Sequence, residues 1–452
     1  MATQEIELSV APSQLVMRCA GEPFLCALDG GDARSWGTGF ALVGFRPRAT
    51  LCVKPDGTAL MRDGHEHPWL GHPFELLDRF CAATAARADT AEPFGGGVVA
   101  ALSYDLRHWV ERLPARARDD LGLPVLYAAA YDWLLSYSYA ERRYRLSSAH
   151  CSAAELRTVA ARLAALATRP APSGSGQPPS ATTDVPAAEY LAAVRATLDY
   201  IAAGDVYQVN FAHRFSVANP PAPTSLFAAL QRQHPMPYAA YVDGGDFALV
   251  SNSPECFLTV DGEAVATFPI KGTRPRGADA SADRALAAQL RADPKERAEH
   301  VMIVDLERND LGRVCRVGTV RVDEFARVRS FPTLHHLVSR VSGRLAPGTR
   351  LADVLRATFP GGSITGAPKI RAMEIIDELE PLRRGFYTGA IGFISCDGRA
   401  VFNLAIRTAV AAANKLTYHA GGGIVADSIP AREYDETLLK AQGFLAALQA
   451  AA

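Results

Sequence analysis

The sequence predicts an α/β or α+β fold with a substantial antiparallel component. Strand-like runs lie close together, as at residues 247–253 and 257–260, which is typical of hairpins. Stretches with apolar residues at helical spacing are mixed with these runs. A regular alternation of strand, helix and strand is absent, so a doubly wound parallel sheet is not expected.

The expected elements begin with a helix at residues 187–205. This stretch is apolar at helical spacing, and Gly204 and Asp205 end it. Strand-like runs follow at residues 206–217, 247–253, 257–260, 318–322, 386–395, 402–410 and 415–421. Further helices are expected at residues 281–292, 294–310, 368–380 and 430–449.

A segment rich in Pro, Ser and Gly divides the chain of 452 residues. Residues 169–185 offer almost nothing to bury and cannot offset the entropy of ordering, so they are expected to form a linker or mobile loop. This segment separates an N-terminal region, residues 1–168, from a longer C-terminal region, residues 186–452.

Charge and cysteine usage exclude several classes of protein. Lys and Arg total 47 against 48 Asp and Glu, so the net charge is −1 and no basic footprint for nucleic acid covers the whole chain. The start lacks the features of a signal peptide, and no segment approaches the ~20 apolar residues that span a bilayer. The eight cysteines are scattered without a CxxC pair. We therefore expect a cytoplasmic protein with reduced thiols and neither a nucleic-acid nor a membrane partner.

Two glycine motifs are candidates for binding loops. Residues 361–369, GGSITGAPK, imitate the spacing of a P-loop, but Ala367 and Pro368 intervene before the lysine, so nucleotide hydrolysis is not expected. The loop runs into a helix whose free N–H groups suit a carboxylate or a phosphate. Residues 421–423 are three glycines after a strand-like run. They allow either close approach of a small ligand to the backbone or a tight strand-to-helix turn.

Two pairs of glutamates stand at helical spacing. Glu296 and Glu299 are three residues apart, and Glu433 and Glu436 repeat that spacing. Residues at i and i+3 share a helix face, so each pair can present two carboxylates to one point. Together the pairs would suit Mg²⁺, which prefers oxygen ligands, whereas two solvated helix faces would show the same spacing.

Several single side chains are further candidates. Lys271 and Glu255 flank strand-like segments. Arg407 lies within a strand-like run, where a buried guanidinium requires a partner or a ligand anion. His335 and His336 are adjacent, and one of them is expected to be structural. Taken alone, residues of these types are more often salt-bridged or surface groups than catalytic ones.

The long motifs of residues 186–452 together resemble those of the chorismate-utilising enzymes. They occur in the order SNSPE, PIKGT, RAEHVMIVDLERNDLGRV, HHLVS, FPGGSITGAPKIRAMEIIDELEP, AIRTA and GGGIVADSIPAREYDET. The N-terminal region matches more weakly through PFGGGVVAALSYDL, in which Ser103 replaces a usual glycine. The resemblance implies a fold like that of anthranilate synthase component I, with two antiparallel sheets packed face to face and flanked by helices. It also implies that residues 186–452 bind chorismate and carry the catalysis.

At two positions this chain has residues that resemble those of the aminodeoxychorismate synthases within this family. Isochorismate and salicylate synthases carry a lysine, the general base that activates water, where this chain has Gln208. Unprotonated ammonia needs no such base. Anthranilate synthases carry alanine where this chain has Lys271, and aminodeoxychorismate synthases carry lysine. The resemblance implies a component I that uses Lys271 as a covalent nucleophile and makes 4-amino-4-deoxychorismate for p-aminobenzoate and folate synthesis.

The same resemblance assigns roles to the other motif residues. Glu255 would be the general acid for the C4 hydroxyl, and His336 would position the substrate. The metal ligands for Mg²⁺ would be Glu299 and Glu436 directly, with Glu296 and Glu433 holding its waters. The substrate-binding residues would be Arg407 and Tyr387 at the enolpyruvyl carboxylate, with Lys440, Thr365, Gly421, Gly422 and Gly423 around the ring carboxylate.

The source of ammonia is expected to be external. No cysteine stands in the GxCxG context of a glutaminase nucleophile, so ammonia would come from solution or from a separate glutamine amidotransferase subunit, as is usual in the family. The stretch Leu28-Asp29-Gly30-Gly31 departs from the LLES motif of the anthranilate synthases, which makes tryptophan inhibition doubtful. Three alternatives stay open: anthranilate synthase component I, which Lys271 opposes; an isochorismate or salicylate synthase, which Gln208 opposes; and a silent regulatory subunit that binds a small molecule.

Overall fold

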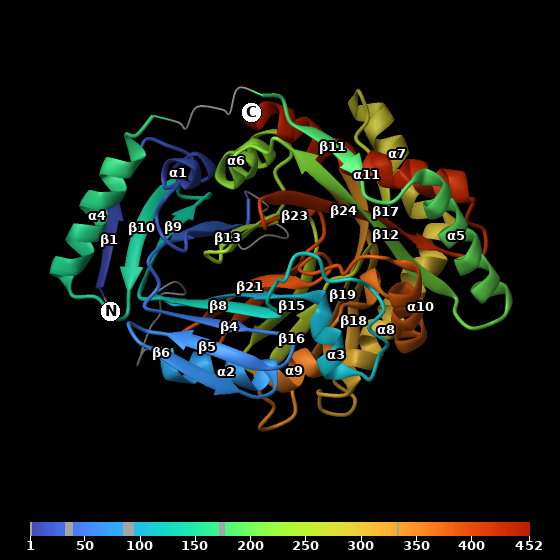
Figure 1. Cartoon of the computed structure of the whole chain (residues 1–452), viewed down its shortest axis with the longest axis horizontal. Helices are drawn as coiled ribbons and strands as arrows, with labels where there is room; N and C mark the ends of the chain where they lie inside the picture. The colour runs from blue at the N-terminus through green and yellow to red at the C-terminus, as the bar shows by residue number, and fades with distance from the viewer. Residues whose placement is uncertain (1, 32–38, 85–94, 171–176, 332–333) are drawn as a thin grey trace.

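Two antiparallel sheets of twelve strands each lie face to face, and helices cover their outer sides (Figure 1). The computed structural model describes residues 2–31, 39–84, 95–170, 177–331 and 334–452. Every pairing between the named strands of these ranges is antiparallel. The predicted fold class is therefore confirmed.

The first sheet combines strands from both sides of the 169–185 segment. In spatial order they are β1 (Ala2–Ile6), β10 (Arg143–Ser148), β9 (Trp133–Ser138), β3 (Phe40–Gly44), β2 (Cys26–Asp29), β13 (Tyr238–Asp243), β14 (Phe247–Ser253), β23 (Thr408–Ala412), β24 (Lys415–Ile424), β12 (Gln208–Ala218) and β11 (Ser180–Thr183). The short β20 (Gly366–Ala367) pairs with the start of β12. The two regions of the sequence join where β2 pairs with β13.

The second sheet is mixed in the same way. Its order is β17 (Ile270–Pro275), β19 (Leu334–Arg344), β16 (Ala264–Thr267), β15 (Cys256–Asp261), β22 (Ala400–Leu404), β21 (Ala390–Ser395), β7 (Gly97–Leu102), β8 (Leu126–Tyr131), β4 (Ala49–Val53), β5 (Thr58–Arg62) and β6 (Glu66–Leu70). An additional strand, β18 (Arg321–Ser330), pairs with β19. Here the two regions join where β7 pairs with β21.

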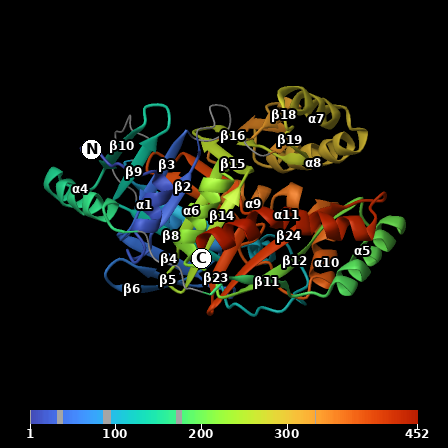
Figure 2. The ribbon, with the colours of Figure 1, turned by 90° about the horizontal axis from the view of Figure 1, so that it is seen from above.

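Helices cover the outer face of each sheet. The first sheet packs against α1 (Pro12–Arg18), α4 (Ala153–Ala167), α6 (Pro223–Gln233) and α11 (Pro430–Ala451). The second packs against α2 (Pro73–Thr84), α8 (Pro294–Gly312) and α9 (Leu351–Thr358). The remaining helices are η1 (Tyr104–Leu106), α3 (Arg107–Val110), α5 (Ala187–Ala202), α7 (Ala280–Ala292), η2 (Gly362–Ile364) and α10 (Lys369–Leu379). Seen from above, α7 and α8 project beside β18 and β19 at one end of the molecule (Figure 2).

The space between the sheets is filled by side chains from both. Phe247 of β14 stacks on Phe386 with ring centroids 5.3 Å apart, and Tyr127 of β8 meets Phe247 edge-on at 5.5 Å. Aromatic pairs of this geometry contribute ~1 kcal/mol beyond the area they bury. This aromatic contact therefore helps to hold the two sheets together.

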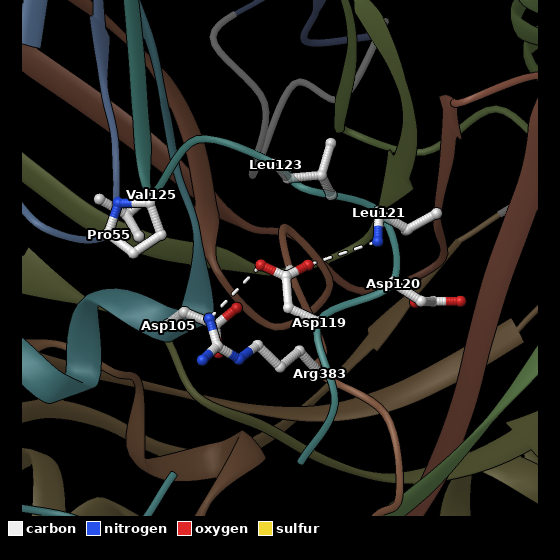
Figure 3. A pocket seen from close by; sticks show the side chains of 9 residues that line it. Pro55, Asp105, Asp119, Asp120, Leu121, Leu123, Val125 and Arg383 are labelled. Carbon is white, nitrogen blue, oxygen red and sulfur yellow. Dashed lines mark hydrogen bonds and ion pairs between the residues drawn. The ribbon is translucent and has the colours of Figure 1, made fainter. Parts of the chain in front are cut away.

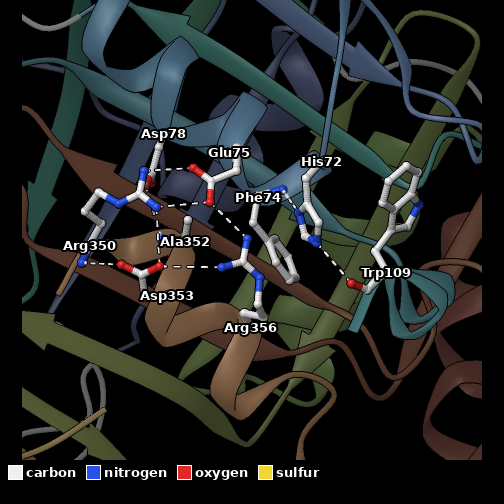
Figure 4. A network of polar contacts seen from close by, with 9 residues as sticks. All are labelled: His72, Phe74, Glu75, Asp78, Trp109, Arg350, Ala352, Asp353 and Arg356. Carbon is white, nitrogen blue, oxygen red and sulfur yellow. Dashed lines mark hydrogen bonds and ion pairs between the residues drawn. The ribbon is translucent and has the colours of Figure 1, made fainter. Parts of the chain in front are cut away.

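An exposed ion network links two helices that are far apart in the sequence (Figure 4). Glu75 of α2 pairs with Arg350, at the N-cap of α9, at 2.8 Å and with Arg356 of α9 at 2.9 Å. Asp353 pairs with both arginines, at 3.3 and 3.5 Å. The network joins the N-terminal region to the C-terminal region on the outside of the second sheet.

Most predicted elements form close to their predicted bounds, but the single strand expected at residues 402–410 is wrong, and the strand expected at residues 318–322 is observed at Arg321–Ser330. One of the two alternatives for the glycines at residues 421–423 is also excluded. The run at residues 402–410 is two strands, because β22 ends at Leu404 and β23 begins at Thr408. Arg407 lies between them with a φ of 51°, which breaks the strand. The glycines at residues 421–423 lie inside β24, paired with β12, and not in a strand-to-helix turn.

Part of the predicted linker is a strand. β11, residues Ser180–Thr183, pairs with β12 at the edge of the first sheet. Residues 171–176 of the same segment lie outside the described residues. Domain boundaries at 168 and 186 stay a prediction of the sequence.

All eight cysteines are free thiols in this structure. Those that are buried are Cys19, Cys26, Cys256 and Cys315. Among the described residues, no helix combines the length and the apolar character needed to cross a membrane.

Candidate active site

Glu255 and Lys271 meet at the η2 turn. The hydroxyl of Ser363 donates to Glu255 Oε1 at 2.7 Å, and Lys271 Nζ donates to the carbonyl of Ser363 at 3.2 Å. The backbone N–H of Ile270 also donates to Glu255 Oε1, at 3.3 Å. A single residue of the turn therefore fixes both the carboxyl group and the amine that the motifs predict to be catalytic.

Burial brings the two groups toward the protonation states that catalysis needs. Burial raises the pKa of Glu255 to about 7, against the hydrogen bonds from Ser363 and Ile270 and the charge of Lys271. Burial also lowers the pKa of Lys271, an effect opposed by Glu299 and reinforced by Lys440. A carboxyl group that holds a proton near neutral pH can act as an acid, and an amine with a lowered pKa is a better nucleophile.

A bulge in β17 directs the Lys271 side chain. The pairing of β17 with β19 shifts register between Lys271 and Thr273. Gly272 lies in this bulge with a φ of 72°, which favours glycine. A Cβ on Gly272 would lie 2.9 Å from Leu290 and 3.0 Å from Glu296 Oε2, so the packing also requires glycine here.

His336 is neutral and presents one free nitrogen. Its Nδ1 lies 3.1 Å from both the carbonyl of Gly272 and the hydroxyl of Thr273, and a proton on Nδ1 would satisfy the carbonyl, which can only accept. Its Nε2 is buried and has no partner among the described residues. Burial and the charge of Arg407 lower the pKa of His336 to about 3. The neighbouring His335 lies between Asp283 at 2.9 Å and Ser330 at 2.8 Å, in agreement with a structural role.

Arg407 has no carboxylate partner among the described residues. Its Nη1 lies 3.9 Å from the sulfur of Met236, and burial lowers the pKa of the guanidinium. The predicted need for a partner is therefore not met by the protein, which leaves the guanidinium for a ligand anion. Tyr387 stacks on His419 with ring centroids 4.9 Å apart.

Gln208 and Gly423 lie directly beside Lys271. A Cβ on Gly423 would be 2.6 Å from Gln208 Nε2 and 3.5 Å from Lys271 Nζ. Gln208 is fully buried, and both of its amide atoms lack a partner among the described residues. An unpaired buried amide costs ~1–3 kcal/mol, so this side chain is poised to bind a polar ligand.

Lys440 and Glu436 of α11 form the adjacent wall. Lys440 Nζ donates to the carbonyl of Gly421 at 2.8 Å and pairs with Glu436 at 2.7 Å. A Cβ on Gly422 would have Glu433, Glu436 and Lys440 as its nearest neighbours, at 3.5–3.7 Å. The backbone of β24 thus faces the predicted carboxylates of α11.

The four predicted metal ligands are neighbours but not a preformed cage. Burial raises the pKa of Glu299 and of Glu433, and Glu433 adds to the effect on Glu299. Lys440 lowers the pKa of Glu436, and Glu296 pairs with Arg274 at 3.2 Å. Across the described ranges, no group of three or more His, Cys, Asp and Glu side chains has an arrangement that could hold a metal ion.

Two polar residues of the GGSITGAPK loop have different contacts. The Thr365 hydroxyl donates to the carbonyls of Gly361 and Gly362, at 3.1 and 3.2 Å, and so stabilises its own loop. Ser363, which sequence reasoning did not single out, contacts both Glu255 and Lys271. Its position in the GGSITGAPK loop was the available signal.

Glu307 was also missed. It is 6% exposed, accepts a hydrogen bond from Thr267 at 2.7 Å, and lies close to Gly362. Burial raises the pKa of Glu307 to about 8, and Glu255 and Asp310 add to the effect. Glu307 follows Glu296 by three helical turns on the same face of α8, which was the signal in the sequence.

A separate small pocket is unsuited to a substrate (Figure 3). It has a volume of about 10 Å³ and is lined by Asp105, Asp119 and Arg383, among others. That volume accommodates about one water molecule. Asp119 is engaged by the N–H of Leu121 at 3.3 Å and by Arg383 at 3.5 Å.

The sequence is similar to those of known proteins over most of its length. Residues 28–446 match the family of chorismate binding enzymes. This chain belongs to that family. It is 42% identical to anthranilate synthase component 1 of Thermus thermophilus over 416 aligned residues. This alignment covers 91% of this chain and 89% of that protein. It is 38% identical to aminodeoxychorismate synthase component 1 of Bacillus subtilis over 421 aligned residues. This alignment also covers 91% of this chain and 89% of that protein.

A solved structure agrees with the assignment to the chorismate binding enzymes. Anthranilate synthase component I of Streptococcus pneumoniae superposes with a TM-score of 0.80 and 30% identity, and covers 90% of this chain and 92% of that one. The chain is thus a chorismate-utilising enzyme. The two curated relatives named above carry different names, anthranilate synthase and aminodeoxychorismate synthase, so identity alone does not choose between these activities.

Proposed function

We propose that this chain is component I of an aminodeoxychorismate synthase, which converts chorismate and ammonia to 4-amino-4-deoxychorismate on the route to p-aminobenzoate and folate. One observation carries the proposal. The amine of Lys271 and the carboxyl group of Glu255 are bound to the same residue, Ser363, at 3.2 and 2.7 Å. A nucleophile and an acid held in this way can act on one substrate.

The first half-reaction uses both groups. The Lys271 amine forms a bond to ring carbon C2, the two ring double bonds shift, and the C4–O bond breaks. Glu255 donates its proton to the departing hydroxyl, which leaves as water. The alkylated amine then releases one proton, which the Glu255 carboxylate can take up.

The second half-reaction restores the lysine. Ammonia forms a bond to C4, the double bonds shift back, and the C2–N bond breaks. Lys271 leaves as a neutral amine after taking up a proton from the incoming nitrogen. The sum is chorismate plus ammonia to 4-amino-4-deoxychorismate plus water. A separate glutamine amidotransferase subunit would supply the ammonia.

The surrounding side chains suit a small dianion. Arg407, which lacks a carboxylate partner among the described residues, would bind the enolpyruvyl carboxylate beside Tyr387. Lys440 and the backbone of β24 would face the ring carboxylate. His336 Nε2 and the amide of Gln208 are buried polar atoms without partners in the described part of the chain, and they would contact the substrate or ammonia.

The four glutamates are not arranged to hold a metal ion in this structure, but their carboxylate oxygens are the ligands that Mg²⁺ prefers. Glu299 and Glu436 would bind the ion, and Glu296 and Glu433 would hold its waters. Burial raises the pKa values of Glu299 and Glu433, and a nearby cation would lower them again by stabilising the ionised carboxylates. Glu436 would give up its ion pair with Lys440 to bind the cation. The ion, when bound, would polarise the ring carboxylate of the substrate.

The deciding experiment supplies chorismate, MgCl₂ and ammonium chloride, and then a lyase that converts aminodeoxychorismate to p-aminobenzoate. The wild-type chain should give p-aminobenzoate, and Lys271→Ala should abolish amination at C4. Lys54→Ala, which changes an exposed lysine on a turn, is the matched control and should behave as the wild type. Fluorescent anthranilate as the main wild-type product, or an unchanged yield from Lys271→Ala, would contradict the proposal.

A further inference from the structure

A buried arginine outside the predicted site binds several segments of the chain at once. Arg384 lies between α10 and β21 and is 3% exposed. Its Nε donates to Glu380 Oε2 at 2.8 Å, and its Nη2 donates to Glu380 Oε1 at 2.7 Å. This bidentate pair compensates the buried charge and fixes the plane of the guanidinium.

The remaining N–H groups of Arg384 reach other segments. Nη1 donates to the carbonyl of Ile364 at 3.0 Å and to the Thr388 hydroxyl at 3.4 Å. Nη2 donates to the carbonyl of Asn210 at 2.7 Å. Together with the two bonds to Glu380, these contacts use all five N–H groups of the guanidinium. A lysine has three N–H groups on one nitrogen and cannot reproduce this set.

Each of these segments carries a residue of the candidate site. Ile364 directly follows Ser363, which binds Glu255 and Lys271. Asn210 lies two residues after Gln208 on β12, and Thr388 follows Tyr387. Arg384 therefore sets the distance between the η2 turn, the start of β12 and the turn that contains Tyr387.

The N-terminal region holds Arg384 in place. The ring of Tyr104 lies against the guanidinium, 4.7 Å from its carbon, and Arg107 lies 4.8 Å from the same ring. Ser103 and Tyr104 both donate to the carbonyl of Gly385 at 2.8 Å, the first through its hydroxyl and the second through its backbone N–H. The hydroxyl of Ser103 thus adds a bond that a glycine at this position would lack.

We propose that Arg384 is a positioning residue of the active site, which holds the η2 turn and the start of β12 in register while Tyr104 supports it from the N-terminal region. That these segments form an active site rests on the proposed function. The hydrogen bonds of Arg384 to them do not depend on it.

The test compares Arg384→Lys with Arg214→Lys. Arg214 is a matched control because it is also buried, at 4% exposure, and binds Asp120 in bidentate fashion at 2.7 and 2.8 Å, but has no hydrogen bond to the η2 turn. The first readout needs no turnover: each protein is acetylated with a limiting N-hydroxysuccinimide ester, and peptide mass spectrometry gives the rate at Lys271 relative to exposed Lys54.

Arg384→Lys should raise the relative acetylation rate of Lys271 severalfold. Without the hydrogen bond from Arg384 to Ile364 the η2 turn shifts, and the Lys271 amine loses its hydrogen bond to the carbonyl of Ser363. It should also lower kcat by about 10²-fold, the usual cost of a 1 Å misplacement, with a smaller change in KM for chorismate. Arg214→Lys should lower only the thermal stability.

The outcomes separate the two proposals. A folded Arg384→Lys chain with the wild-type acetylation ratio and kcat would overturn the positioning role. A changed ratio in a protein whose wild type yields no aminodeoxychorismate would support positioning and contradict the proposed function. If Arg384→Lys does not fold, Tyr104→Leu removes the stacking but none of the five hydrogen bonds, and should shift the ratio in the same direction by less. A wild-type ratio in folded Tyr104→Leu would then count against the proposal.

Discussion

Two buried carboxyl groups flank the Gly362–Ser363 turn, and burial is the main cause of the raised pKa of both. Glu255 is bound by Ser363 and Ile270 and feels the charge of Lys271, and its pKa is raised to about 7. Glu307 has the hydroxyl of Thr267 but is repelled by Glu255 and Asp310, with Lys369 opposing, and its pKa is raised to about 8. Both carboxyl groups can therefore hold a proton near neutral pH.

The raised pKa of Glu307 predicts a pH dependence of stability. A carboxyl group that ionises more readily in the unfolded chain destabilises the fold as pH rises from the unfolded value of about 4.5 toward about 8. Glu307→Gln keeps the shape without the charge. Thermal denaturation should show that the variant gains stability relative to wild type between pH 5.5 and pH 8.5. A difference that is constant over this range would contradict the assigned pKa.

Individual residues of the candidate site could be predicted from the sequence only where the residue type and its position in a motif identified them. Glu255, Lys271 and the choice of His336 over His335 all come from motif positions. In the structure Glu255 and Lys271 meet at the η2 turn, and His336 contacts Gly272, the residue after Lys271. Ser363 could not be chosen among the polar residues of its loop, because its role depends on contacts to residues about a hundred positions away. Glu307 required knowledge of which face of α8 is buried.

At the scale of elements, the pairing of β24 with β12 forms the floor of the candidate site. Gly421, Gly422 and Gly423 pair with Ala212, Phe211 and Asn210, and the side chains that approach this floor come from β12, β17 and α11. Because Gly423 has no Cβ atom, Gln208 and Lys271 can lie directly against its backbone. The glycines are therefore required by close approach within a strand and not by a turn.

Neighbouring glycines of β24 should respond differently to alanine. A Cβ on Gly423 would lie 2.6 Å from Gln208 Nε2, whereas a Cβ on Gly422 has no neighbour nearer than 3.5 Å. Gly423→Ala should cost about 1–3 kcal/mol of folding free energy, because the buried amide must move. Gly422→Ala should cost less than Gly423→Ala in the same urea denaturation series. Equal costs would show that the close approach to Gln208 is not maintained in solution.

Element prediction succeeded where the pattern was local. The predicted bounds of the helices α5, α7, α8, α10 and α11 lie within a few residues of those observed. The single strand expected at residues 402–410 failed because the positive φ of Arg407 breaks it, and an arginine gives no such signal. The strand β11 was missed because its four residues follow a Pro- and Ser-rich segment.

At the scale of the whole molecule, the two sequence regions form one structure. Both sheets contain strands from each region, joined at the β2–β13 and β7–β21 pairs. A third connection is buried: Arg107 of α3 donates to Asp377 of α10 at 2.7 Å, with side-chain exposures of 3% and 1%. The composition of residues 169–185 predicted a division of the sequence, but it held no information on strand pairing across the division.

Two adjacent acidic residues of α10 test this connection. Asp377→Ala leaves Arg107 buried without its partner and should cost about 3–5 kcal/mol in urea denaturation. Glu378→Ala removes an exposed pair with Arg116, whose side chain is 63% exposed, and should cost ~1 kcal/mol or less. Both variants should unfold in one transition, because the regions share their sheets. A second transition in Asp377→Ala would indicate that the regions unfold separately.

The shared sheets also constrain how the chain is made. During synthesis, β7 leaves the ribosome long before β21, its partner near residue 390, and β2 must wait for β13. The nascent N-terminal part therefore exposes unpaired strand edges for most of translation, which favours association with other chains. We expect newly made protein to depend on chaperones that shield such edges, and refolding from urea to be slow and sensitive to protein concentration.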